Sequence, residues 1–149
     1  MKTLLKSLIL FSLSISCTNH KSVERKITKI NFSSSPCLGE CPVMRFEIDS
    51  NRNFKFSGER FTPMLGRYIG KMDDSKYTSL VNCLDSLKFD KGIKRPLCDD
   101  CQTFKLLLQY NTSEIDTNNL DTDIGNEIAE KLLVLYKEID LKAIAQPSK

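Results

Sequence analysis

The segment CLGECP at residues 37–42 constrains the fold of this chain more than any other stretch. Two thiols bracket a glycine, whose backbone freedom relieves the geometry of a tight loop, and Pro42 leads directly into an alternating strand. The segment therefore predicts a cysteine-bearing loop at the start of a β-hairpin.

The residues that follow predict the hairpin itself. Residues 43–49 alternate between apolar and polar positions, residues 50–53 read as a turn, and residues 53–57 return as a second strand. In the turn, Asn51 tolerates the left-handed conformation, and Gly58 ends the second strand. The apolar side chains of the two strands share one face: Met44, Phe46, Ile48, Phe54 and Phe56.

Alternation predicts four more strands. They span residues 26–32, 67–69 and 115–117, together with residues 103–110, where the alternation is strong. In the first of them, Ile27 faces one way and Ile30 and Phe32 face the other. The segment 67–69 reads as a short edge strand, and residues 111–114 form the turn of a second hairpin.

Two segments show helical spacing of apolar residues. The first helix is capped by Asp73 or Asp74, and the second by Asp121 or Thr122. The first apolar stripe is Tyr77, Leu80, Val81, Leu84 and Leu87. The second is Ile124, Ile128, Leu132, Leu135 and Ile139. The predicted fold class is α+β: an antiparallel sheet built from two hairpins plus edge strands, with two helices packed on one face.

The first residues predict a targeting signal, so they are not part of the fold. Lys2 and Lys6 accompany an apolar run at residues 4–15 that is too short for a comfortable membrane-spanning helix. Small residues before Cys17 resemble the lipobox of bacterial lipoproteins, where the peptide is cut before a cysteine that then carries acyl chains such as palmitate. We expect residues 1–16 to be a lipoprotein signal peptide; an ordinary signal peptide is the alternative.

Lipidation at Cys17 would hold the protein at a membrane without a spanning helix. Residues 17–26 then form a lipidated tether, residues 27–142 a single α+β domain, and residues 143–149 a flexible tail. Because Thr18, and not aspartate, follows the cysteine, resemblance to lipoprotein sorting rules favours the outer membrane, facing the periplasm.

Charge and composition exclude several functions. Cleavage removes two of the 22 basic residues, Lys2 and Lys6, and leaves 20 against 19 acidic ones, a net charge of +1. A near-neutral domain has no electrostatic footprint for nucleic acid. The single histidine, His20, lies in the tether, which weakens any histidine-based mechanism. The expected partners are the membrane, through the lipid, and an unknown envelope protein or small ligand; no cofactor is expected.

Five cysteines remain if Cys17 is lipidated, and an oxidising compartment makes disulfides their default state. Four of them form two close pairs in the sequence: Cys37 with Cys41, and Cys98 with Cys101. Cross-pairing would join the starts of the two hairpins and stabilise the fold by about 3–4 kcal/mol per bridge. Gly39 favours local closure, but the sequence leaves the pairing open. Cys83 flanks an apolar stripe and reads as a half-buried apolar residue.

Two other readings of the cysteines stay open. Cys37, Cys41, Cys98 and Cys101 could together hold a tetrahedral zinc ion, although the long separation of the two pairs is unlike common zinc ribbons. A thiol–disulfide role for Cys98 and Cys101 is disfavoured, because the two intervening aspartates would raise the thiol pKa and the motif precedes a strand.

The run Cys37-x-Gly39-x-Cys41-Pro42, followed by a hairpin that closes on Gly58, resembles a family of bacterial lipoprotein domains of unknown function. The matching positions are Cys37, Gly39, Cys41, Pro42, Gly58 and, at the acidic residue before a later strand, Asp100. Met44 replaces the usual tyrosine of that family, and Asn51-Arg52 replaces its Asp-Gly turn. The resemblance covers about residues 31–110 and implies no activity.

No catalytic set of residues stands out in the sequence. The expected function is therefore that of a membrane-anchored lipoprotein acting as a non-enzymatic binding or envelope-scaffold module. The alternatives are a zinc-binding module that uses the four cysteines, or a thiol–disulfide protein.

Overall fold

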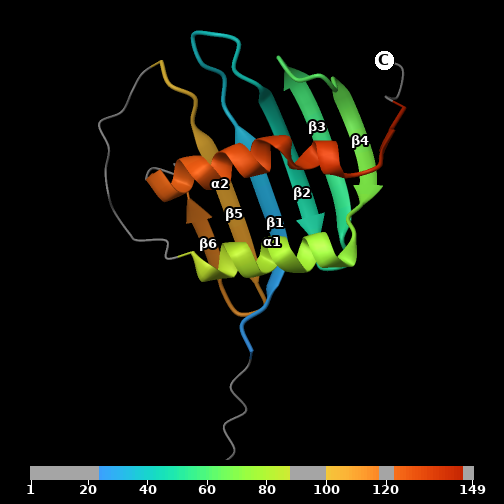
Figure 1. Cartoon of the computed structure of the whole chain (residues 1–149), viewed down its shortest axis with the longest axis vertical. Helices are drawn as coiled ribbons and strands as arrows, with labels where there is room; N and C mark the ends of the chain where they lie inside the picture. Colours follow the sequence, from blue (N-terminus) through green and yellow to red (C-terminus); the bar gives the residue numbers. More distant parts are fainter. Residues whose placement is uncertain (1–23, 88–99, 118–122, 146–149) are drawn as a thin grey trace, which may run out of the picture.

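The computed structural model describes residues 24–87, 100–117 and 123–145. All the strands of the described segments belong to one seven-stranded antiparallel sheet with the strand order β6-β5-β1-β2-β3-β4-β7 (Figure 1). The strands are β1 (Ile27–Ser34), β2 (Val43–Asp49), β3 (Asn53–Arg60), β4 (Gly66–Lys71), β5 (Phe104–Tyr110), β6 (Glu114–Thr117) and β7 (Leu141–Ala143). The predicted α+β class is confirmed, with the sheet as its larger part.

Helices lie across one face of this sheet (Figure 1). They are α1 (Asp74–Ser86), α2 (Asp123–Val134) and the 3₁₀ helix η1 (Leu135–Glu138), which continues from α2. Among the described residues, no helix has both the length and the apolarity needed to cross a membrane.

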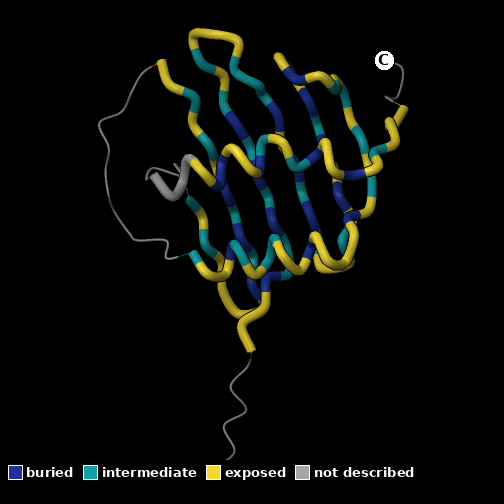
Figure 2. Tube along the Cα trace, in the orientation of Figure 1, coloured by how far each residue is buried: buried dark blue, intermediate teal, exposed yellow. Residues whose placement is uncertain are grey.

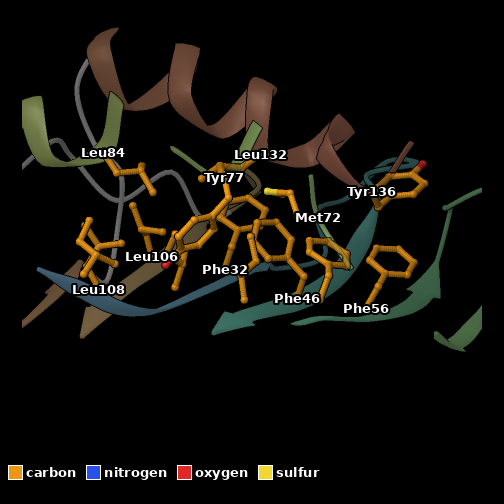
Figure 3. Packing of buried hydrophobic residues seen from close by; sticks show 14 of the residues in the cluster. Phe32, Phe46, Phe56, Met72, Tyr77, Leu84, Leu106, Leu108, Leu132 and Tyr136 are labelled. Carbon is orange, nitrogen blue, oxygen red and sulfur yellow. The ribbon is translucent and has the colours of Figure 1, made fainter. Parts of the chain in front are cut away.

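The core fills the space between the sheet and the helices (Figure 3). Phe32, Phe46 and Phe56 lie in cross-strand register on β1, β2 and β3, and the rings of Phe32 and Phe46 stack with centroids 5.2 Å apart. From the helical side, Tyr136 of η1 stacks on Phe56 at 4.6 Å, while Leu132 of α2 is fully buried. Stacked pairs of this kind add about 0.5–1.5 kcal/mol each beyond the burial of their area.

Within the described segments, no helix covers the other face of the sheet. Along β2, the buried side chains of Met44, Phe46 and Ile48 alternate with more exposed ones, including Arg45 and Glu47, and the same alternation recurs on β3 (Figure 2). Successive strand side chains point to opposite faces, so burial of the aromatic positions forces the polar positions outward. The predicted apolar face of this hairpin is confirmed.

In β1 the predicted facing of Ile27 was wrong. Ile27, Ile30 and Phe32 are all buried in the core. The pairing of β1 with β5 shifts register between Ile27 and Lys29, and such a bulge inserts one extra residue into a strand. The irregularity returns Ile27 to the core side, which strict alternation would not allow.

Two predicted details of the first hairpin were also wrong. The left-handed residue of its turn is Arg52, with φ of 69°, and not Asn51. Asp49 holds this turn, since its carboxylate accepts hydrogen bonds from the backbone N–H groups of Asn51 and Asn53, both at 2.9 Å. Gly58 does not end the second strand, because β3 continues to Arg60.

The C-terminal part differs from the predicted helical stripe. α2 ends at Val134, and Ile139 is extended, with φ of −118° and ψ of 135°. Leu141–Ala143 then forms β7, which pairs with β4. Residues 67–69, which were predicted as an edge strand, therefore lie inside the sheet as part of β4. The predicted caps Asp121 and Thr122 lie outside the described residues. Apolar spacing alone does not distinguish a helix from the turn and strand that follow it.

Gly58 marks a place where the chain approaches itself closely. A Cβ atom there would overlap the carbonyl oxygen of Met64 and lie 2.5 Å from the hydroxyl oxygen of Thr62. Both neighbours belong to the connection between β3 and β4, and Thr62 is itself held by a hydrogen bond to the Met64 carbonyl at 3.0 Å. The glycine therefore lets this connection fold back onto β3.

Substitution of Gly58 by alanine should destabilise the protein by at least about 2 kcal/mol, because the overlap is with backbone, which cannot move aside cheaply. Urea unfolding under non-reducing conditions measures the change. Gly39→Ala is the matched control, since its Cβ would meet only the Cys37 sulfur, at 3.8 Å. Equal stability of the two variants would contradict this account of Gly58.

Candidate functional site

The loop between β1 and β2 carries the cysteine segment of residues 37–42, here called the cysteine loop. Cys37 and Cys41 are joined by a disulfide with their Cα atoms 5.8 Å apart, which is the local closure that the sequence favours. Gly39 lies exposed within the ring, and Leu38 is 82% exposed. The ring is short, so it constrains few residues in the unfolded chain and stabilises the fold by about 2 kcal/mol.

Hydrogen bonds tie the cysteine loop to the ends of three strands. The hydroxyl of Ser34 donates to the carbonyl of Pro42 at 2.7 Å and accepts from the backbone N–H of Met44 at 3.1 Å. The side-chain amide of Gln102 donates to the carbonyls of Pro42 and Ser35 at 2.7 and 3.0 Å. These bonds fix β1, β2 and the start of β5 relative to one another.

Of the other predicted site residues, Asp100 and Cys101 directly precede Gln102, whose side chain contacts this loop. Cys101 is disulfide-bonded, and Asp100 is exposed in the turn before β5. Cys83 carries a free, half-buried thiol on α1. Cys17 and Cys98 lie outside the described residues. Within the described segments, no group of three or more His, Cys, Asp or Glu side chains is arranged to hold a metal ion.

A concavity of about 570 Å³ lies on the face of the sheet that the helices leave open. Its outward-pointing lining is polar or charged at eight of nine positions, with one leucine: Asn31, Ser33, Arg45, Glu47, Lys55, Ser57, Arg67, Lys105 and Leu107. Four of these side chains are cations and one is an anion, so the concavity is electropositive although the whole domain is nearly neutral.

Five lining residues form one line across five strands. Lys105 of β5 pairs with Ser33 of β1, Ser33 with Arg45 of β2, Arg45 with Ser57 of β3, and Ser57 with Arg67 of β4. Directly opposed residues point to the same face of a sheet. We call this line the cationic row: three basic side chains that alternate with two serine hydroxyls.

Beside the cationic row, the carboxylate of Glu47 is shared by two lysines. Glu47 accepts from the ammonium groups of Lys29, at 2.7 Å, and of Lys55, at 3.1 Å. The hydrogen bond from Lys29 lowers the pKa of Glu47, partial burial opposes that effect, and the bond from Lys55 lowers it further. Glu47 therefore stays ionised and holds both lysines.

The ion pairs of the cationic row are more exposed. Arg45 approaches Glu59 at 3.6 Å and Lys105 approaches Asp116 at 3.1 Å, in pairs whose side chains are 40–68% exposed. Arg67 has no ion-pair partner among the residues that the structure describes. Exposed pairs contribute little to stability, typically about 0.2–1 kcal/mol, so these cations can exchange their partners for an anionic ligand at small cost.

Sequence reasoning missed this row. Alternation along residues 43–49 places Arg45 opposite the apolar face, and that signal was available. The alignment of Arg45 with Ser33 and Lys105 could not be predicted from the sequence. It depends on the position of β1 between β2 and β5, which are distant in sequence. Basic side chains in such a row can bind oxyanions by charge-assisted hydrogen bonds.

Stability should fall in acid partly through Glu47. Folding lowers the pKa of this carboxyl group, so its ionised form stabilises the folded state. That stabilisation is complete above the pKa of Glu47 in the unfolded chain, and it is lost as the pH falls through the lower pKa of Glu47 in the folded protein. Glu47→Gln should cost about 0.5–1 kcal/mol at neutral pH and flatten the decline of stability below about pH 4.5. Denaturant unfolding across pH 2–7 measures this. The control Glu130→Gln, exposed on α2, should keep the wild-type decline; an unchanged decline in the Glu47 variant would refute the assignment.

Comparison with known proteins gives a family without an assigned role. The model of a domain of unknown function, DUF6438, matches residues 28–142, which include every strand and helix described above except the first residue of β1 and the last of β7. No curated protein and no solved structure matches the chain. The match covers most of the sequence, and the chain therefore belongs to the DUF6438 family.

Proposed function

We propose that this protein is a lipid-anchored binding module of the bacterial cell envelope, which holds its ligand on the open face of the sheet and catalyses no reaction. The observation that carries the proposal is the one-sided cover of the sheet. The helices bury the aromatic face, and the other face presents a concavity lined by four cations. Concave surfaces with convergent polar groups are the usual sites of ligand binding.

The course of the chain is compatible with an anchor at Cys17. Residues 24–26 lead into β1 at the end of the sheet opposite the cysteine loop (Figure 1). Lys26 is held there, since its backbone N–H donates to the side chain of Asn111 at 3.1 Å, and the guanidinium of Arg25 lies 3.8 Å from the ring centre of Tyr110. A tether that leaves at this end would keep the cationic row away from the point of attachment.

The alternative functions have less support. A zinc site made from four cysteines needs four thiolates, whereas Cys37 and Cys41 share a disulfide. A thiol–disulfide protein needs an activated, accessible cysteine. The hydrogen bonds that tie the cysteine loop to three strands favour a bracing role for the Cys37–Cys41 bridge.

Anchoring is tested by Cys17→Ser in the full chain. The wild-type protein should fractionate with membranes and incorporate labelled palmitate, and the variant should lose the label. Cys83→Ser is the control, because Cys83 is a half-buried thiol on α1, and it should keep the label. Palmitate incorporation that persists in the Cys17 variant, or a wild-type protein without label, would contradict the anchor.

Ligand binding on the open face is tested by lysine labelling in isolated native envelopes. An amine-reactive reagent should modify Lys105 several-fold more slowly in envelopes than in the protein purified in neutral detergent, because a bound ligand covers the cationic row. Lys137 of η1, on the helical side, is the internal control and should react equally in both samples. Equal reactivity of Lys105 in the two samples would contradict the proposed site.

A further inference from the structure

We infer that the ligand of the open face is a linear acidic polysaccharide that lies across the strands along the cationic row. The inference rests on the proposed function and adds the chemical class of the ligand. It follows from the length of the row, the order of its side chains, the weakness of their present ion pairs, and the residue types that surround them.

The length of the row favours an extended ligand. Neighbouring strands lie about 4.8 Å apart, so Lys105, Arg45 and Arg67, which occupy every second strand, are spaced by about 10 Å and span about 19 Å. A single small anion would contact one or two of these cations. A chain with repeated oxyanions can contact all three, and each further contact is intramolecular once the first has formed.

The order of the side chains favours a sugar polymer. Ser33 and Ser57 stand between the basic residues, and both line the concavity. Each serine hydroxyl can donate one hydrogen bond and accept others. An acidic polysaccharide presents the complementary sequence of groups, with carboxylates separated by ring oxygens and hydroxyls. Guanidinium groups bind planar carboxylates in a two-pronged geometry, which suits Arg45 and Arg67.

The present ion pairs of the row are easily exchanged. Arg45 and Glu59 are 3.6 Å apart and largely exposed, and a carboxylate of the ligand can replace Glu59 without uncovering a buried charge. The adjacent Glu47 is different, because Lys29 and Lys55 already occupy it. The cations of the row can therefore turn to a ligand, whereas the less exposed carboxylate of Glu47 keeps Lys29 and Lys55 in place.

The surroundings of the row disfavour two other polyanions. Single-stranded nucleic acids are bound largely by stacking on exposed aromatic side chains. The aromatic residues that border the concavity, Phe32, Phe46 and Phe56, are buried in the core. A densely charged membrane surface or duplex would bring phosphates close to Glu47, Glu59 and Asp116, which flank the row. A single chain that follows the row comes near fewer of these acids than a membrane surface or a duplex does.

Titration of the full chain, in neutral detergent, with polygalacturonate tests the inference. Calorimetry should detect binding that weakens as salt is raised, and galacturonate monomer should bind at least about 100-fold more weakly. Arg45→Gln and Arg67→Gln should each reduce the affinity at least about tenfold. Lys137→Gln, which removes a cation on the helical side, is the matched control and should change affinity less than twofold.

Three results would overturn the inference. The first is no binding of polygalacturonate. The second is an equal loss of affinity in Lys137→Gln and Arg67→Gln, which would show that binding depends on the net charge of the protein and not on the cationic row. The third is equally tight, Arg45-dependent binding of single-stranded DNA or of phosphatidylglycerol vesicles. Any of these results, together with protection of Lys105 in native envelopes, would refute the polysaccharide but leave some other ligand on the open face. If Lys105 is not protected in native envelopes, the proposed function itself is refuted.

Discussion

Burial on a single face of the sheet is the constraint on which the rest of the structure depends. Phe32, Phe46 and Phe56 lie side by side on three central strands, and the helices close over them. Because each strand alternates, every aromatic residue placed in the core sends its neighbours to the uncovered side. The outward direction of Ser33, Arg45 and their partners is thus a geometric consequence of the core. Packing of the core does not constrain which residue types occupy these outward positions.

The cysteine loop and Gly58 position the cationic row by holding the register of the strands. The bonds from Ser34 and Gln102 hold β1, β2 and β5 at the end of the sheet nearest the row. Gly58 lies opposite Met44 on β2, one position beyond Ser57, and lets the β3–β4 connection close over β3. A slip of one residue in any of these pairings would turn a row side chain toward the core. The segment most conspicuous in the sequence therefore positions the site without being part of it.

The sequence predicts local features well and non-local ones poorly. The faces of the first hairpin follow from alternation over a few residues, and the helix of residues 74–86 follows from its apolar spacing. The bulge beside Ile27, the strand at Leu141–Ala143 and the place of β1 between β2 and β5 depend on pairing between distant segments. Of the site, the outward direction of Arg45 was predictable; its alignment with Lys105 and Arg67 required the sheet.

The central claim is that the uncovered face, and specifically the cationic row, carries the ligand. Nuclear magnetic resonance of the full chain in micelles, with a short oligogalacturonate added, measures this residue by residue. The account predicts that the largest amide shifts fall at Ser33, Arg45, Ser57 and Arg67, while α1 and η1 remain unchanged. Shifts concentrated on the helices, or on the cysteine loop alone, would contradict it.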